Sequence, residues 1–238
     1  ISVHLKNIIL CPEKYPTLEH YPFTLPIFHQ TKQLSLDTPV TFFVGENGTG
    51  KSTLLEALAH ACDIHIWRIS AGPRFQVNRF EGQLCNYLSL KWSNGRVPGS
   101  FFGSEMFKDF ANILDEWAVT DPGQLKYFGG KSLVTQSHGQ ALMSYFRSRY
   151  QIKGIYLLDE PLAHLDAKIR NELRAEFQNI KSFLSNSTVV YVTHDYLEAL
   201  SLGDKIAVIN EGEIIQIDEP MKIYNEPETL FVAQLFGQ

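Results

Sequence analysis

The chain has 238 residues, 44% of them hydrophobic, and carries 21 Lys and Arg against 26 Asp and Glu, for a net charge of −5. This length and composition bury one large α/β core, or a core with a smaller lobe, and exclude a disordered protein. The acidic balance and the lack of a Lys/Arg block argue against a dedicated nucleic-acid surface. Three cysteines without a close pair fit a reducing compartment better than a disulfide framework.

No apolar run approaches the ~20 residues that cross a bilayer, and the N-terminus lacks the basic-then-apolar pattern of a signal peptide. We therefore expect a cytoplasmic protein. Any role at the membrane would be exerted through partner chains at its inner face.

A predicted strand over residues 2–10 is the first regular segment, and several prolines keep the backbone irregular after it. Residues 40–44 form an apolar, β-branched strand that breaks into a glycine-rich loop, and residues 53–59 follow as a helix. The loop has the pattern G-x4-G-K-S, which is typical of phosphate binding. Its candidate nucleotide-binding residues are Gly45, Glu46, Asn47, Gly48, Thr49, Gly50, Lys51, Ser52 and Thr53.

Each residue type in this loop has a physical reason. Glycines accept positive φ, so the backbone N–H groups turn inward around a phosphate, and the following helix directs its N-terminal dipole at the anion. Lys51 adds a positive charge for the β/γ oxygens, and Ser52 is placed to ligate Mg²⁺. The alternative is a glycine turn that only joins strand to helix.

The middle of the chain has a weaker pattern. Residues 63–103 mix Gly, Pro, Asn and aromatics without a sustained period, which indicates loops with short strands. A helix is predicted over 105–117, and a second over 139–150. In the first, one face carries Met106, Phe110, Ile113, Leu114 and Trp117.

A zinc site is an alternative use of one cluster in this region. His60, Cys62 and His65 lie close together in sequence, and Cys85 comes later. The spacing is not that of a standard finger or ribbon, so a helix end with a buried cysteine is favoured.

From residue 154 the pattern alternates between strands and helices, which predicts a parallel sheet with crossover helices. Asp159 and Glu160 follow the apolar strand 155–158, at the edge where parallel strands present side chains to a ligand. Phosphoryl transfer needs a metal and a positioned nucleophile. We therefore assign Asp159 to Mg²⁺ and Glu160 to the attacking water. Helix capping by the two acids is the alternative.

His194 follows a second apolar strand, 188–192, and points toward the same crevice. A neutral imidazole there can donate to the γ-phosphate, although a packing or capping role is the alternative. The catalytic candidates are therefore Lys51, Glu160 and His194, and the metal candidates are Ser52 and Asp159.

These motifs together resemble the ATP-binding cassette (ABC) ATPases: the phosphate loop, Leu157-Leu158-Asp159-Glu160-Pro161, Leu165-Asp166 and Val192-Thr193-His194-Asp195. From Leu157 to Gly237, about a third of the chain, the similarity is to ATPase subunits of bacterial importers. Residues 21–158 are more similar to soluble predicted ATPases related to chromosome and repair ATPases. The resemblance implies a P-loop NTPase fold of ABC type: a mixed α/β core lobe, about 1–62 and 154–238, and a helical lobe, about 63–153.

The family also carries a Leu-Ser-Gly-Gly-Gln segment before the acidic pair. The matching place here is Gln136-Ser137-His138-Gly139-Gln140, in which Ser137, Gly139 and Gln140 match and two positions depart. In the family this segment caps the γ-phosphate of the nucleotide held by a second subunit. The resemblance therefore implies a head-to-tail homodimer that encloses two ATP molecules.

Two family features are not clear in the sequence. Gln76 and Gln83 are the candidates for the family's glutamine loop, and neither matches convincingly. An aromatic residue upstream of the phosphate loop stacks on adenine in the family. Tyr21, Phe23 and Phe28 are the candidates here, and each is equally well a core residue.

The sequence thus predicts an ATPase that binds MgATP and hydrolyses it. Its purpose has three interpretations: energising an importer through transmembrane permease subunits, acting as a soluble nucleotide-gated clamp on nucleic acid or protein, or dimerising on ATP with negligible turnover. The net charge ranks nucleic acid below a membrane protein as partner.

Overall fold

Two sheets organise the chain in the computed structural model, which describes residues 3–67, 78–150, 152–184 and 186–237. The larger sheet has six strands in the order β5-β6-β7-β3-β8-β9, and the smaller has three in the order β2-β1-β4. Their bounds are β1 Leu5–Leu10, β2 Gln33–Ser35, β3 Val40–Gly45, β4 Leu88–Trp92, β5 Gly99–Gly103, β6 Ile155–Asp159, β7 Thr188–Thr193, β8 Lys205–Asn210 and β9 Glu213–Asp218.

Strands β5, β6, β7, β3 and β8 are parallel, so their carboxyl ends meet at one edge of the sheet. β9 forms the other edge of the sheet as an antiparallel partner of β8, across a turn at residues 211–212. The smaller sheet is antiparallel throughout.

Helices cover both faces of the larger sheet. The α-helices are α1 Ile27–Gln30, α2 Lys51–Ala61, α3 Phe107–Thr120, α4 His138–Arg149, α5 Ala167–Leu184, α6 Tyr196–Leu202, α7 Pro220–Asn225 and α8 Leu230–Leu235. Short 3₁₀ segments are η1 Pro12–Lys14, η2 Gln83–Tyr87, η3 Ser104–Met106 and η4 Pro122–Phe128.

The central strand β3 divides the interior into two cores. Its side chains alternate, so Phe43 joins α2 and the smaller sheet in one core, and Phe42 and Val44 join the helical side in the other. All three side chains are at most 2% exposed. The phosphate loop begins at the end of β3, where the two cores meet, and continues directly into α2.

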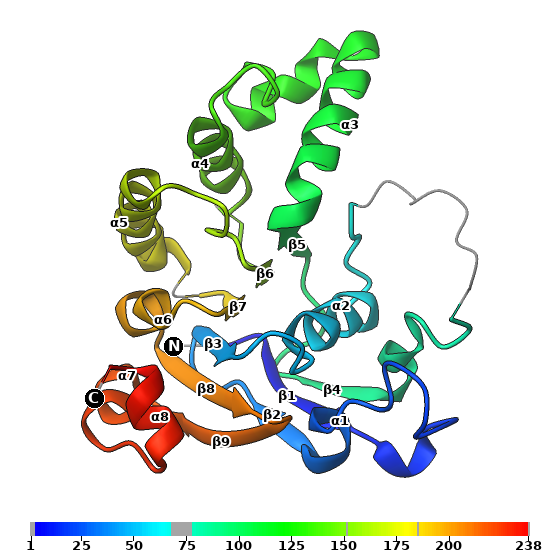
Figure 1. Ribbon diagram of the computed structural model, residues 1–238. Coiled ribbons are helices and arrows are strands. Elements are labelled where there is room, and N and C mark those ends of the chain that lie inside the picture. Colours follow the sequence, from blue (N-terminus) through cyan, green and yellow to red (C-terminus); the bar gives the residue numbers. More distant parts are fainter. Residues whose placement is uncertain (1–2, 68–77, 151, 185, 238) are drawn as a thin grey trace.

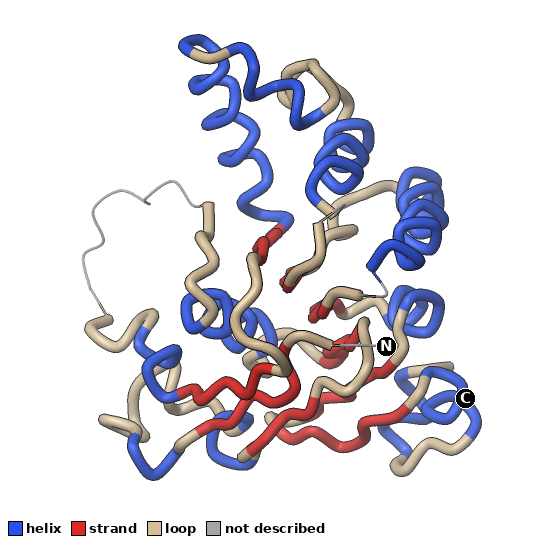
Figure 2. The backbone as a smooth tube through the Cα atoms, turned by 180° about the vertical axis from the view of Figure 1, so that it is seen from behind, coloured by secondary structure: helices blue, strands red, loops and turns tan. Residues whose placement is uncertain are grey.

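Helices α3 and α4 extend away from the sheets, with α5 beside α4 (Figure 1). Seen from behind, the strands gather in the lower half of the molecule and these helices rise above them (Figure 2). α4 is tied to α5 by Phe146 against Phe177, with ring centroids 4.7 Å apart.

The short strands predicted within residues 63–103 are present as β4 and β5. β4 pairs with β1, and β5 pairs with β6, so both strands belong to the sheets although the range 63–153 assigned them to the helical lobe. Within α3, Phe110 and Leu114 are buried as predicted, whereas Trp117 at the distal end is 42% exposed. Trp117 packs edge-on against Trp67, with ring centroids 5.1 Å apart, and this contact covers only part of its side chain.

No helix in the described part of the chain is long and apolar enough to cross a membrane.

Candidate functional site

The loop between β3 and α2 has the backbone that the glycine pattern predicts. Gly50 is the N-cap of α2 with φ 94°, a left-handed conformation that glycine adopts without strain, and it gives the helix no side-chain cap. A Cβ at this position would lie 2.9 Å from Cγ2 of Ile27. An uncapped helix N-terminus leaves backbone N–H groups available to an anion.

Lys51 is buried beneath this loop, at 5% exposure. Its Nζ donates to the carbonyl oxygens of Gly45 at 2.8 Å and Glu46 at 2.6 Å, and to the hydroxyl of Thr49 at 3.3 Å. Burial lowers the pKa of Lys51 from its ordinary value, and the charges of Glu160, Asp159 and Glu46 act in the opposite sense. The loop therefore holds a desolvated ammonium group at the wall of the cleft.

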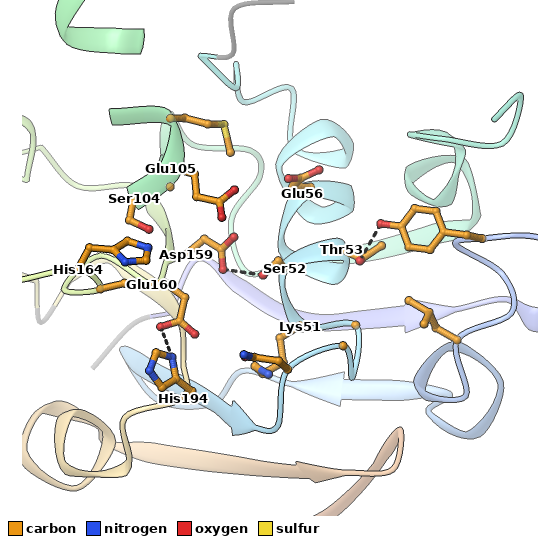
Figure 3. A pocket seen from close by; sticks show the side chains of 18 residues that line it. Lys51, Ser52, Thr53, Glu56, Ser104, Glu105, Asp159, Glu160, His164 and His194 are labelled. Atoms are coloured by element: carbon orange, nitrogen blue, oxygen red, sulfur yellow. Dashed lines mark hydrogen bonds and ion pairs between the residues drawn. The ribbon is translucent and has the colours of Figure 1, made fainter. Parts of the chain in front are cut away.

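Asp159 ends β6 and faces the first turn of α2. Oγ of Ser52 donates to Oδ1 of Asp159 at 2.9 Å (Figure 3). Burial raises the pKa of Asp159 to about 6; the bond from Ser52 lowers it, and the carboxylates of Glu160, Glu56 and Glu105 raise it further. A carboxylate in such surroundings is poorly stabilised as an anion without a cation beside it.

Glu160 takes the next position in a strained backbone. Its φ is 48°, and its N–H donates to the carbonyl of Val192 at 2.9 Å, which fixes the turn after β6 against β7. Oε2 of Glu160 lies 2.9 Å from Nδ1 of His194 (Figure 3). His194 is 60% exposed, so one face of the pair is open to the cleft. If Nδ1 carries the hydrogen, a neutral ring leaves Nε2 as an acceptor.

These side chains line a cleft of about 500 Å³ at the carboxyl edge of the sheet. The structure brings together nine residues that the sequence assigned to the site: Asn47, Gly48, Gly50, Lys51, Ser52, Thr53, Asp159, Glu160 and His194. The remaining loop residues, Gly45, Glu46 and Thr49, belong to the same loop and accept the hydrogen bonds of Lys51 Nζ.

Four polar residues that line the cleft were not predicted: Glu56, Ser104, Glu105 and His164. Ser104 and Glu105 follow β5, whose Gly103 is in register with Asp159, so the rule that identified Asp159 applies to them once β5 is known. Glu56 lies one helical turn after Ser52 on α2. His164, with φ 62°, has no sequence signal.

The three aromatic candidates for adenine stacking differ in whether they are buried in the core or exposed at the cleft. Phe23 and Phe28 are fully buried in the core between α2 and the smaller sheet. Tyr21 is 46% exposed, lines the cleft, and its hydroxyl lies 3.0 Å from Oγ1 of Thr53.

The segment 137–140 lies elsewhere, at the start of α4. Ser137 and Gln140 form a capping box: Oγ of Ser137 accepts from the Gln140 N–H, and Oε1 of Gln140 accepts from the Ser137 N–H, both at 3.4 Å. Both side chains are exposed, and neither lines the cleft of its own chain. Gly139 is buried against Ile169 of α5, and a Cβ at position 139 would lie 2.6 Å from Cγ2 of Ile169.

The remaining candidates that the structure describes do not line the cleft. In the ranges that the structure describes, no group of three or more His, Cys, Asp or Glu side chains is placed to hold a metal ion, so the zinc interpretation gains no support. Burial raises the pKa of Cys62 to about 12, as for an inert core thiol. Gln83 does not line the cleft, and Gln76 lies outside the described residues.

Comparisons with known proteins agree with this geometry. A family model described as an AAA domain matches residues 26–72, which contain the phosphate loop. An uncharacterized ABC transporter ATP-binding protein, YcjV of Escherichia coli, is 30% identical over 225 residues, covering 88% of this chain and 61% of the relative. The match therefore extends well beyond the C-terminal third.

Two further relatives have named roles in import. The sn-glycerol-3-phosphate import ATP-binding protein UgpC of Roseobacter denitrificans is 34% identical, over 84% of this chain and 58% of its own length. The maltose/maltodextrin import ATP-binding protein MalK of Mannheimia succiniciproducens is 31% identical, over 88% and 59%. The chain thus spans about three fifths of the length of these curated relatives.

A solved structure shares the fold. A chain of an ABC transporter in an inward-facing conformation superposes with a TM-score of 0.53 at 18% identity, covering 92% of this chain and 85% of that chain. This chain therefore has the mixed α/β fold of that neighbour, a chain of an ABC transporter.

Proposed function

Because the chain is homologous to ATP-binding proteins of ABC transporters over most of its length, we propose that it binds MgATP and hydrolyses it to ADP and phosphate. The observation that carries this proposal is the convergence of Lys51, Ser52, Asp159 and Glu160 in one cleft. The uncapped helix N-terminus and the buried ammonium group offer positive charge to the phosphates of a nucleoside triphosphate. The two carboxylates offer oxygens to a metal ion and to the attacking water.

The residues present fit a magnesium ion. Ser52 and Asp159 offer two adjacent hard oxygens, 2.9 Å apart, and the raised pKa of Asp159 indicates a carboxylate that needs a cation. In this arrangement the ion would neutralise charge on the phosphate oxygens.

Protein groups carry the rest of the reaction in this proposal. Lys51 and the N–H groups at the start of α2 bind and orient the phosphates. Glu160 accepts a proton from the attacking water at a carboxylate oxygen, and His194 holds that carboxylate from the exposed side. Tyr21 is the candidate to stack on the base.

A second copy of the chain completes the site in this proposal. Ser137 accepts the Gln140 N–H through its oxygen, so its own hydrogen is free to donate to a γ-phosphate across a head-to-tail dimer. Gln140 is exposed beside it, and Gly139 keeps α4 close to α5.

We assign the energy of hydrolysis to transport through transmembrane permease subunits, with this chain at the inner face of the membrane. The named roles of UgpC and MalK in import support this assignment. The net charge of −5 gives no global attraction for a nucleic acid, which ranks a soluble clamp on nucleic acid second.

The test is to measure nucleotide binding by calorimetry and phosphate release, with and without Mg²⁺, for the wild-type chain and for Lys51→Ala. Binding and turnover that need both Lys51 and Mg²⁺ support the proposal, and turnover that persists in Lys51→Ala refutes the assignment of the cleft. A second arm measures the ATPase rate at low salt with single- and double-stranded DNA. Several-fold stimulation that fades as salt rises would replace the transport role with the clamp.

A further inference from the structure

Two loops meet at one side of the cleft. Loop 160–166, between β6 and α5, carries Glu160 and His164, and the turn 194–195, between β7 and α6, carries His194. In the cleft the two loops meet at the pair of Glu160 and His194, whose imidazole is 60% exposed. An exposed pair of this kind holds its two side chains only weakly.

A second contact between these loops comes from α5. Nη2 of Arg170 donates to the carbonyl oxygen of Leu165 at 3.0 Å, and Nη1 of Arg170 lies 3.6 Å from Oδ2 of Asp195. Leu165 belongs to loop 160–166, and Asp195 directly follows His194. Arg170 itself does not line the cleft. One guanidinium therefore contacts both loops from outside the cleft.

Asp195 is a firmly held end for this link. Its Oδ1 accepts the N–H groups of Leu197 at 2.9 Å and Glu198 at 3.3 Å, so it caps α6, and its Oδ2 accepts Nη2 of Arg174 at 2.5 Å. The Asp195 side chain is 16% exposed. Because both carboxylate oxygens are engaged by charged or backbone donors, Asp195 holds its place and Arg170 is fixed against it.

The position of Arg170 carries a cost. Its Nε is buried and has no hydrogen-bond partner within the described part of the chain. A buried unpaired donor destabilises a fold, because its lost hydration is not replaced. The fold thus places this guanidinium where it reaches Leu165 and Asp195, although one of its donors stays unpaired there.

We infer that Arg170 is a positioning residue that holds loop 160–166 in register with His194, and so keeps Glu160 aligned with the attacking water; this rests on the proposed role of Glu160 as the base. The planar fork of Arg170 reaches two oxygens in fixed directions, which a single ammonium group does not do. Arg170 acts only through the two loops and touches neither the nucleotide nor the water.

The first experiment measures kcat and KM for ATP in Arg170→Gln and Arg170→Lys. We expect kcat to fall about tenfold in both variants while KM stays within about twofold, because the loops lose their alignment but the phosphates remain bound. Arg170→Lys keeps the charge and loses the fork, so a wild-type kcat in this variant would overturn the inference. Arg147→Gln is the matched control, since it breaks another ion pair to α5, with Glu176 at 2.7 Å, and keeps the wild-type kcat.

Arg174 separates positioning from stability. Arg174→Gln removes the closer and better buried partner of Asp195, so we expect a larger decrease in the urea midpoint of unfolding than in Arg170→Gln. It leaves the bond to Leu165 in place, so kcat should fall less. A merely structural role would rank the losses of kcat in the order of the losses of stability, and that order would overturn the inference.

A double-mutant cycle tests the link at its other end. Asp195→Asn retains a side chain that caps α6 but loses the charge that faces Arg170. We expect the kcat of Asp195→Asn with Arg170→Gln to be no lower than that of the more impaired single variant, because both changes break one link. Losses of kcat that multiply would overturn the inference.

A readout without turnover separates this inference from the proposed function. The N–H of Ala163 donates to the carbonyl of Glu160 at 3.0 Å within loop 160–166, and its amide hydrogen exchange reports the order of the loop in the nucleotide-free chain. We expect this exchange to be several-fold faster in Arg170→Gln and unchanged in Arg147→Gln. That result in a chain that hydrolyses no ATP would refute the proposed function and support the link. Hydrolysis together with Ala163 exchange that is insensitive to Arg170 would overturn the inference alone.

Discussion

The two helix N-termini that the sequence assigns to phosphate, at the starts of α2 and α4, are built differently. Gly50 gives α2 no side-chain cap, and the surrounding cleft gathers Lys51, Ser52 and Asp159. α4 begins with a complete capping box of Ser137 and Gln140 on an exposed surface. The first N-terminus has no side-chain cap within the chain, whereas the second has one. In the proposed function the start of α2, the binding end, holds the nucleotide of its own chain, and the start of α4, the presenting end, offers Ser137 to a second chain.

The largest expected effect is on the binding end. Glu160→Gln retains the length of the side chain but not its basicity, so we expect MgATP affinity to be retained and hydrolysis to fall at least ~100-fold. Single-turnover phosphate release measures the loss, and the exposed Glu172→Gln in α5 is the control. Turnover near the wild-type rate would remove Glu160 from the role of base.

The presenting end is tested in the Glu160→Gln background, where ATP persists. With MgATP we expect sedimentation to show a dimer that returns to monomer with ADP. Ser137→Arg should abolish the dimer, because it puts bulk and charge at the start of α4. Ser35→Arg on the exposed side of β2 is the control. A monomer at tens of micromolar in every nucleotide state would contradict the division between the two ends.

The electrostatics of the binding end predict a stability difference that depends on pH. The pKa of Asp159 is about 6 in the folded chain against an ordinary value of 3.8, so the folded state holds this proton more tightly. That contribution to stability is fully present below 3.8 and is lost as pH rises through about 6.

Asp159→Asn removes the ionised form. In the absence of nucleotide and metal, at a pH above about 6, we expect the variant to be more stable than wild type by about 2–3 kcal/mol, at about 1.4 kcal/mol per pKa unit. The difference should shrink in acid. Urea unfolding below pH 3.8 and above about pH 6 measures the difference in the free energy of unfolding. A difference independent of pH would contradict the electrostatic cause.

The smallest effect concerns the packing of the presenting end. Gly139→Ala puts a Cβ 2.6 Å from Cγ2 of Ile169, so we expect a loss of about 1–3 kcal/mol from overpacking. Ile169→Ala in the same chain should recover part of this loss, and a double-mutant cycle measures the coupling. Additive losses would mean that α4 and α5 do not meet through these two residues.

The binding end could be predicted because each of its parts follows an apolar strand. β3, β6 and β7 are continuous apolar runs, so the residues after them, Lys51 with its loop, Asp159 and His194, were placed at one edge by the parallel-sheet rule. β5 is a short run between two glycines, Gly99 and Gly103, in a region without periodicity, and Glu105 was missed with it.

Burial was harder to predict than position. Tyr21, Phe23 and Phe28 are similar aromatic residues in one segment, and only the packing of α2 against the smaller sheet decides which of them faces the cleft. Glu198 is the one charged residue of α6, and nothing local indicates that it is 2% exposed, with its Oε2 2.8 Å from the hydroxyl of Tyr191 in β7. The presenting end depends on a second chain, which one sequence does not place.

The left-handed backbone at Glu160 lowers the stability of the fold at a residue that the proposed function needs for hydrolysis. A non-glycine residue at φ 48° costs about 1–3 kcal/mol, and glycine accepts the same conformation freely. Glu160→Gly should therefore give a chain that resists heat better than Glu160→Gln while being equally unable to activate water. Selection for stability alone would favour glycine at position 160. The glutamate there retains a strained backbone conformation because the proposed reaction needs its carboxylate.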